Sequence, residues 1–166
     1  MRIYNPSKYS YITIVEIPKD EISKIDMDIC AQPRHFGGFS MKEITVLKVE
    51  PMCVPEVVTI KNDLRSLQEA VSIDAPYVGL IEIVNIDAKT CILCNEEAKL
   101  IGLQPNRRLG YDVLCGVFYV VGQDGRGNLT SLSPAAMERY QKIFATPEII
   151  GREEAEATMM AMFCSM

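Results

Sequence analysis

The side chains best suited to chemistry lie in one segment, residues 95–112, which reads NEEAKLIGLQPNRRLGYD. It places carboxylates, amides and guanidiniums between two apolar runs that are typical of β-strands. Eight polar or charged residues form this predicted binding site: Asn95, Glu96, Glu97, Lys99, Asn106, Arg107, Arg108 and Asp112. They match no catalytic signature that fixes a reaction, so three interpretations stay open.

In an enzyme, Glu96 or Asp112 would act as a general base, and Arg107 would hold a nucleotide or another anionic substrate. The guanidinium suits that role because it matches a carboxylate or phosphate at two points. However, the sequence has no Ser–His–Asp set and no nucleophile with an evident base, and its single histidine is His35. We therefore predict no catalytic residue and keep a small enzyme as the alternative.

In a binding protein, the same segment would recognise a partner protein or a small polar ligand such as a nucleotide. Arg107 and Arg108 would supply positive charge, and Asn95 and Asn106 would supply hydrogen bonds. This interpretation needs the polar side chains to share a pocket. We expect one, because the segment connects two strands and would lie at the rim of their sheet.

In a purely structural role, the segment would only fasten a long loop to the sheet. Asn95 and Asn106 would then satisfy the backbone of turns, and Arg107 would pair with Glu97 or Asp112. The sequence alone does not separate this interpretation from binding.

Composition limits the class of partner. The chain has 22 acidic and 17 basic residues and a net charge of −5, so it lacks the basic field that drives direct binding to nucleic acid. The N-terminus does not read as a signal peptide, and no run approaches the roughly 18 apolar residues that span a bilayer. We expect a cytoplasmic protein with no membrane partner, and a homo-oligomer is compatible with these features.

The six cysteines are predicted to be reduced and mostly buried thiols. Cys91 and Cys94 form a CxxC pair, but there is no second pair and only one histidine, so a four-ligand zinc site lacks partners. We predict no metal site and no cofactor.

Alternation of apolar residues and turn signals predict the strands. The expected strands are residues 9–17, 43–49, 56–60, 77–86, 90–94, 112–122 and 129–132. Residues 77–86 and 90–94 should form a hairpin, and the glycines of residues 122–128 should form a second hairpin turn.

Three helices are expected. Asn62 or Asp63 caps a helix over residues 64–71, whose buried stripe would be Leu64, Leu67 and Val71. Ser133 caps a second helix, with Pro134 at its first position and an apolar stripe of Met137, Tyr140 and Phe144. A third helix covers residues 152–163, with an apolar face of Ala155, Met159, Met162 and Phe163 that packs on its own domain or on a partner. The fold class is therefore α+β, a mixed, mainly antiparallel sheet with two or three helices packed on it.

The chain divides into three parts in this interpretation. Residues 1–40 form an N-terminal extension with one strand and a glycine-rich linker at residues 33–40. Residues 41–146 form the core domain, and residues 147–166 form a C-terminal amphipathic helix.

Several stretches resemble the uncharacterised family called domain of unknown function 3846. They are KEITVLKVEP at residues 42–51, EVVTIKNDLRSLQEAV at 56–71, IEIV at 81–84, NEEAKLIGLQPNRR at 95–108, DVLCGVFYVVG at 112–122 and SLS at 131–133. The likeness covers about residues 41–144. Ala98, where the family often has glycine, and residues 75–79, where it has a glycine pair, depart from the pattern.

The resemblance implies an accessory protein of a phage, plasmid or integrative element, and it brings no established activity with it. Family members start near Met41, which agrees with an added N-terminal element. We predict a small non-catalytic binding protein of a mobile genetic element, and interference with a host or competitor system is a role that such a context implies.

Overall fold

The computed structural model describes residues 42–164, with side chains up to residue 158. Predictions that concern residues 1–41, including the first strand, the linker and His35, lie outside the described residues, as do the side chains of Met159, Met162 and Phe163. The division of the chain into three parts stays a prediction.

The centre of the fold is an antiparallel sheet in the order β2-β1-β7-β4-β3, with a short strand β8 paired to the end of β7. Its strands are β1 (Glu43–Val49), β2 (Glu56–Lys61), β3 (Ile81–Asp87), β4 (Thr90–Asn95), β7 (Phe118–Gln123) and β8 (Leu129–Thr130). Strands β1, β7 and β4 occupy the middle and are the most apolar, whereas β2 and β3 form the two edges. The predicted hairpins β3–β4 and β7–β8 are both confirmed.

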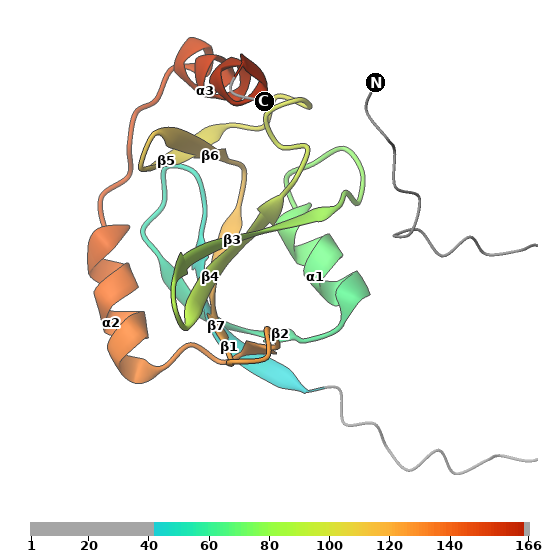
Figure 1. Ribbon diagram of the computed structural model, residues 1–166, viewed down its shortest axis with the longest axis vertical. Coiled ribbons are helices and arrows are strands. Elements are labelled where there is room, and N and C mark those ends of the chain that lie inside the picture. The colour runs from blue at the N-terminus through green and yellow to red at the C-terminus, as the bar shows by residue number, and fades with distance from the viewer. Residues whose placement is uncertain (1–41, 165–166) are drawn as a thin grey trace, which may run out of the picture. The chain divides into compact units, whose positions relative to one another are not determined.

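Two helices cover the two faces of this sheet (Figure 1). Helix α1 (Leu64–Val71) is capped by Asp63, whose carboxylate accepts a hydrogen bond from the backbone N–H of Ser66 at 3.0 Å. Leu67 and Val71 pack on one face, but the prediction that Leu64 joins them is wrong, since it is 69% exposed. Leu64 is the first residue of this short helix, and most of its side chain is open to solvent.

Helix α2 (Pro134–Ile143) begins after the predicted cap Ser133. Tyr140 and Phe144 are buried against the other face of the sheet, where the Phe144 ring meets Phe118 edge-on at 5.2 Å between centroids. The core therefore has two layers, one under each helix, as expected for an α+β domain with a mainly antiparallel sheet.

The predicted strand over residues 112–122 is in fact two strands in two sheets. Strand β6 (Asp112–Cys115) pairs with β5 (Pro105–Leu109), which the sequence does not predict, and β7 begins afresh at Phe118. The break falls at Gly116, whose φ of +70° suits glycine and whose Cα faces Leu103 so closely that a Cβ would stand 2.7 Å from that side chain. The strand predicted over residues 77–86 also begins later than expected, since β3 spans Ile81–Asp87.

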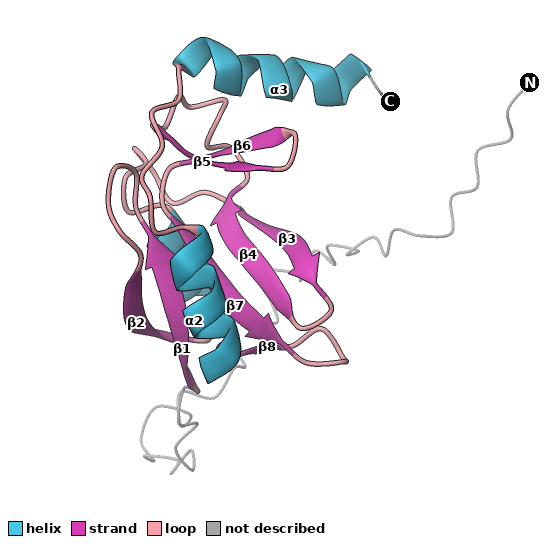
Figure 2. Ribbon diagram, turned by 90° about the vertical axis from the view of Figure 1, so that its left-hand side faces the viewer, coloured by secondary structure: helices cyan, strands magenta, loops and turns pink. Residues whose placement is uncertain are grey.

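Helix α3 (Arg152–Cys164) lies across the small β5–β6 sheet (Figure 2). Ala155 contributes the buried contact, together with Val113, Cys115 and Ala98. No helix within residues 42–164 has the length and apolar character needed to cross a bilayer.

Candidate functional site

A pocket of about 470 Å³ opens where β4 and β3 meet the turn after β4 and strand β6. We call it the rim pocket. Its lining includes five residues of the predicted binding site, namely Asn95, Glu96, Glu97, Lys99 and Asp112. The structure thus brings together more than half of the predicted residues, at the rim of the sheet as expected.

The rim pocket combines an apolar wall with excess negative charge. Leu80, Leu100, Val113 and Leu114 are among the apolar lining residues. The charged lining consists of four acidic side chains, Glu82, Glu96, Glu97 and Asp112, against one basic side chain, Lys99. A concave surface of one charge sign on a low-dielectric wall attracts counter-ions, so the rim pocket favours positively charged groups.

One ion pair crosses the rim pocket. Lys99 Nζ contacts Asp112 Oδ1, and the same oxygen accepts a hydrogen bond from the backbone N–H of Val113 at 2.7 Å. Both side chains are more than two-thirds buried. No ion pair among the described residues involves Glu82, Glu96 or Glu97. These three carboxylates are the ones that an incoming cation would meet.

Asn95 lines the rim pocket and is hydrogen-bonded to neighbouring parts of the protein. Its Oδ1 accepts a hydrogen bond from the Glu97 N–H at 2.9 Å, and its Nδ2 donates to the Ser72 hydroxyl at 3.3 Å. That hydroxyl accepts a further bond from the Gly79 N–H at 3.0 Å. Asn95 is therefore buried and engaged with the protein, as the structural interpretation predicted for it.

Arg107 does not line the rim pocket, so the structure does not bring it together with the predicted residues that do. It is 1% exposed, and its guanidinium donates to the backbone oxygens of Phe144 (3.0 Å) and Cys53 (2.7 Å). The same group donates to Asn106 Oδ1 at 2.8 Å. The predicted pairing with Glu97 or Asp112 is wrong, since these partners are neutral oxygens. Burial lowers the pKa of the Arg107 guanidinium.

Asn106 is buried beside Arg107 and is likewise absent from the rim pocket. Its Nδ2 donates to the carbonyls of Val49 (3.0 Å) and Gly116 (2.7 Å). Together the two side chains link β5 to the end of β1, to the β1–β2 loop and to the C-terminal end of α2. This arrangement explains how the small sheet is held to the main one.

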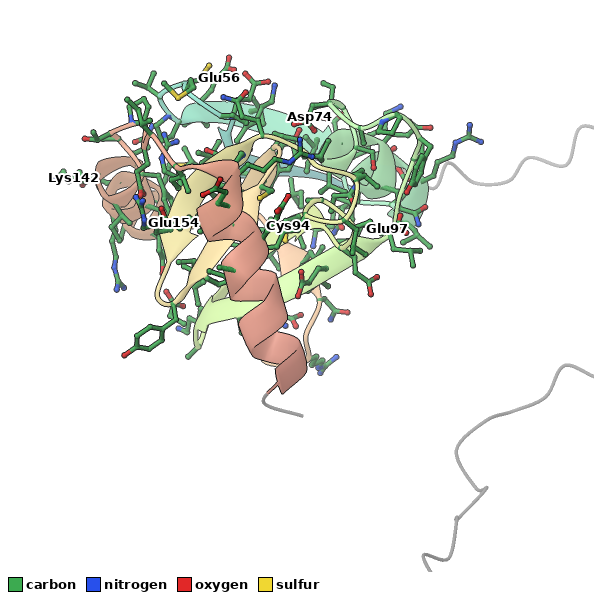
Figure 3. All side chains as sticks on the ribbon, turned by 90° about the horizontal axis from the view of Figure 1, so that it is seen from above. Glu56, Asp74, Cys94, Glu97, Lys142 and Glu154 are labelled. Atoms are coloured by element: carbon green, nitrogen blue, oxygen red, sulfur yellow. The ribbon has the colours of Figure 1, made fainter. Side chains whose placement is uncertain are left out.

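Arg108 does not line the rim pocket and instead binds α3 through ion pairs. Its guanidinium binds both carboxylate oxygens of Glu154, at 2.6 and 2.8 Å, and one oxygen of Glu148 at 2.7 Å. Hydrogen bonds from Arg108 lower the pKa of Glu154. Figure 3 shows Glu154 on one side of α3, whereas Cys94 and Glu97 lie on the other. Arg108 is thus engaged away from the rim pocket.

The thiols in the rim pocket are not suited to nucleophilic catalysis. Burial, and then the neighbouring Glu82 carboxylate, raise the pKa of Cys94 to about 12, and burial raises the pKa of Cys115 as well. Cys91 and Cys94 pack in the layers on opposite faces of the sheet, so the CxxC pair does not converge on one ion. Within the part of the chain that the structure describes, no group of three or more His, Cys, Asp or Glu residues is placed to hold a metal ion.

Sequence reasoning missed part of the rim pocket. Glu82, Leu80 and Leu100 line it but lie outside the predicted site. The available signal was Glu82 in the IEIV stretch, a carboxylate on the face of the strand that carries Val84. An exposed carboxylate in an apolar alternation indicates a position at a sheet edge, next to solvent.

Comparison with protein families confirms the resemblance found in the sequence. The model described as "Domain of unknown function (DUF3846)" matches residues 44–145, which is more than half of the chain. The match covers β1 to α2 and includes the residues of the rim pocket. Neither the curated proteins nor the solved structures contain a match to the chain. The chain therefore belongs to this family.

Proposed function

We propose that this member of the DUF3846 family is a non-catalytic binding protein whose rim pocket takes a group of a partner molecule. The observation that carries the proposal is the rim pocket itself, about 470 Å³ of concave, partly apolar surface that gathers five of the predicted residues. Binding sites are typically concave and apolar with a few convergent polar groups, and the rim pocket has this form.

The geometry favours binding over the alternative of a small enzyme. Catalysis through Glu96, Arg107 and Asp112 needs the three side chains in one place, but Arg107 is buried elsewhere and Asp112 is paired with Lys99. The raised pKa of Cys94 disfavours a thiolate nucleophile at neutral pH.

The excess of carboxylates also changes the chemistry of the proposed ligand. Because Arg107 and Arg108 are engaged with the protein, Lys99 is the one basic side chain among the described lining residues that an anionic ligand such as a nucleotide could contact. A partner with positive charge fits better, and direct binding of nucleic acid stays disfavoured. The mobile-element context implied by the family resemblance is part of this proposal, and the partner would then be a protein of a host or competitor.

The proposal is tested by filling the mouth of the rim pocket. Leu100 lines the pocket and is 69% exposed, so Leu100→Trp should narrow it without disturbing the core. The matched control is Leu64→Trp, because Leu64 has the same 69% exposure and lies on α1, away from the rim pocket.

We expect the partner that co-purifies with the unaltered protein to be lost from the Leu100→Trp variant and retained by Leu64→Trp. Native mass spectrometry of both variants reports the bound partner and the folded state together. Equal retention by the two variants, or no bound partner with any of the three proteins, would contradict the proposal.

A further inference from the structure

Strand β3 is an edge strand that borders the rim pocket. It pairs with β4 on one side, and no strand among residues 42–164 pairs with its other side. An unpaired edge presents backbone N–H and C=O groups that an extended segment of another molecule recognises by adding a strand. The register with β4 shifts between Asn85 and Asp87, so the regular part of this edge runs from Ile81 to Asn85.

The two faces of this edge differ in chemistry. Glu82 lies opposite Cys94 and reaches within 3.8 Å of its Sγ atom, so its carboxylate is on the side of the rim pocket. Ile83 lies opposite Leu93, on the other face, and is 51% exposed. An added strand would therefore place one side chain beside a carboxylate and the next beside an exposed isoleucine.

Further exposed apolar residues surround the same edge. Tyr77, Val78 and Leu80, in the segment that leads into β3, are each at least 50% exposed, as is Leu100 across the rim pocket. Large apolar side chains grouped at the surface mark sites of interaction. The apolar patch, the open edge and the carboxylates are contiguous, since Leu80, Glu82 and Leu100 all line the rim pocket.

The negative charge around the β3 edge favours a basic partner segment over a second copy of this chain. A segment with lysine or arginine at alternate positions would set cations against Glu82 and the carboxylates of Glu96 and Glu97. A second copy of this chain is a poorer occupant, because it would bring another Glu82 and a further net charge of −5 to the same surface.

We propose that β3 binds an extended basic segment of a partner protein by strand addition, with a lysine or arginine side chain entering the rim pocket and alternate apolar side chains lying on Ile83. This inference rests on the proposed function and names its partner class and binding mode.

The probe is the peptide acetyl-Thr-Val-Lys-Val-Lys-Val-Thr-amide, which has a cationic face and an apolar face in a strand. The full chain, labelled with ¹⁵N, is titrated with this peptide, and amide shifts and amide hydrogen exchange are followed by NMR. We expect saturable shifts and slower exchange at residues 81–85, and no such change in β2. The counterpart with glutamate in place of both lysines should bind at least about fivefold more weakly, because attraction to the edge becomes repulsion.

Two sets of N-methylated peptides test the strand addition itself. Methyl groups on the valine amides and methyl groups on the lysine amides block opposite edges of the peptide strand. One set should abolish binding and the other should leave binding unchanged, because only one edge of the added strand faces β3. Equal effects of both sets would overturn strand addition.

The charge is tested on the protein by Glu82→Lys, with Glu56→Lys as the matched control. Glu56 is an exposed carboxylate on β2, the other edge of the sheet, so both variants change the net charge equally. Glu82→Lys should weaken peptide binding by about fivefold or more, and Glu56→Lys by much less.

Equal weakening by the two variants, no binding of the peptide, or dimerisation of the chain through β3 would each overturn the inference. These results are distinguishable from failure of the proposed function, since that function is judged by the partner lost from Leu100→Trp and needs neither the peptide nor an added strand on β3.

Discussion

The predicted site divides into two regions that are close in sequence but differ in whether they line the rim pocket. The first, residues 95–99 with Asp112, lines an open pocket and leaves Glu96 and Glu97 without an ion pair among the described residues. The second, residues 106–108, is engaged with the protein throughout, through buried Asn106 and Arg107 and through the ion pairs of Arg108. Polar character alone does not distinguish a region that lines a pocket from one that supports the fold.

The difference shows which part of the predicted site holds neighbouring elements together. Arg107 reaches the carbonyl of Cys53 in the β1–β2 loop, next to Met52, which has a φ of +60° that is uncommon for a residue other than glycine. It also donates to the carbonyl group of Phe144 at the end of α2, a position that favours positive charge. The supporting region thus fixes the surroundings of β5 and β6, and β6 in turn forms a wall of the rim pocket.

The largest expected effect comes from removing the buried guanidinium. Arg107→Ala should lower the free energy of unfolding by about 3 kcal/mol or more, because it leaves a cavity and several buried oxygens without donors. Arg107→Lys should also destabilise, since an ammonium does not reproduce the planar fork. Urea denaturation measures both changes. A loss no larger than that of the double change Glu96→Gln and Glu97→Gln would mean that the two regions do not differ in the proposed way.

A smaller effect is expected at the ion pairs of Arg108. Arg108→Ala should cause a modest loss of stability that shrinks as salt is added, because exposed ion pairs are screened. The Glu154 pKa is lowered in the folded state, so its contribution is full above the ordinary value of 4.5 and is lost as the pH falls through the folded value. The stability difference between the unaltered protein and Arg108→Ala should therefore be present at pH 7 and shrink in acid, as followed by thermal unfolding at several pH values. A difference that grows in acid would contradict this assignment.

The smallest effect on stability is expected in the rim pocket. The double change Glu96→Gln and Glu97→Gln should alter the free energy of unfolding by no more than about 0.5 kcal/mol, since neither carboxylate has an ion pair among the described residues. Binding of the basic peptide should nevertheless weaken. Loss of stability comparable to that of Arg107→Ala would show that these carboxylates support the fold, and would remove the contrast between the regions.

Sequence patterns identified most of the secondary structure because the signals were local. The alternation in residues 43–49 matches β1 residue for residue, and the caps Asp63 and Ser133 begin α1 and α2. The predictions of secondary structure fail where contacts between residues distant in the chain determine the structure. The break between β6 and β7 falls at Gly116, which has a φ of +70° and lies beside the Leu103 side chain, and β5 is a strand paired with β6.

The candidate site shows the same limit. The sequence alone determined the fold class, the family and the segment that carries the chemistry, because propensity, capping and motif order are properties of neighbouring residues. Only the tertiary structure decided that Arg107 is buried, that Lys99 pairs with Asp112, and that Glu82 from another strand borders the same pocket. The physical reason is that burial and polar contacts depend on residues far apart in the chain, such as Arg107 and Cys53, which are 54 positions apart and which only folding brings into contact.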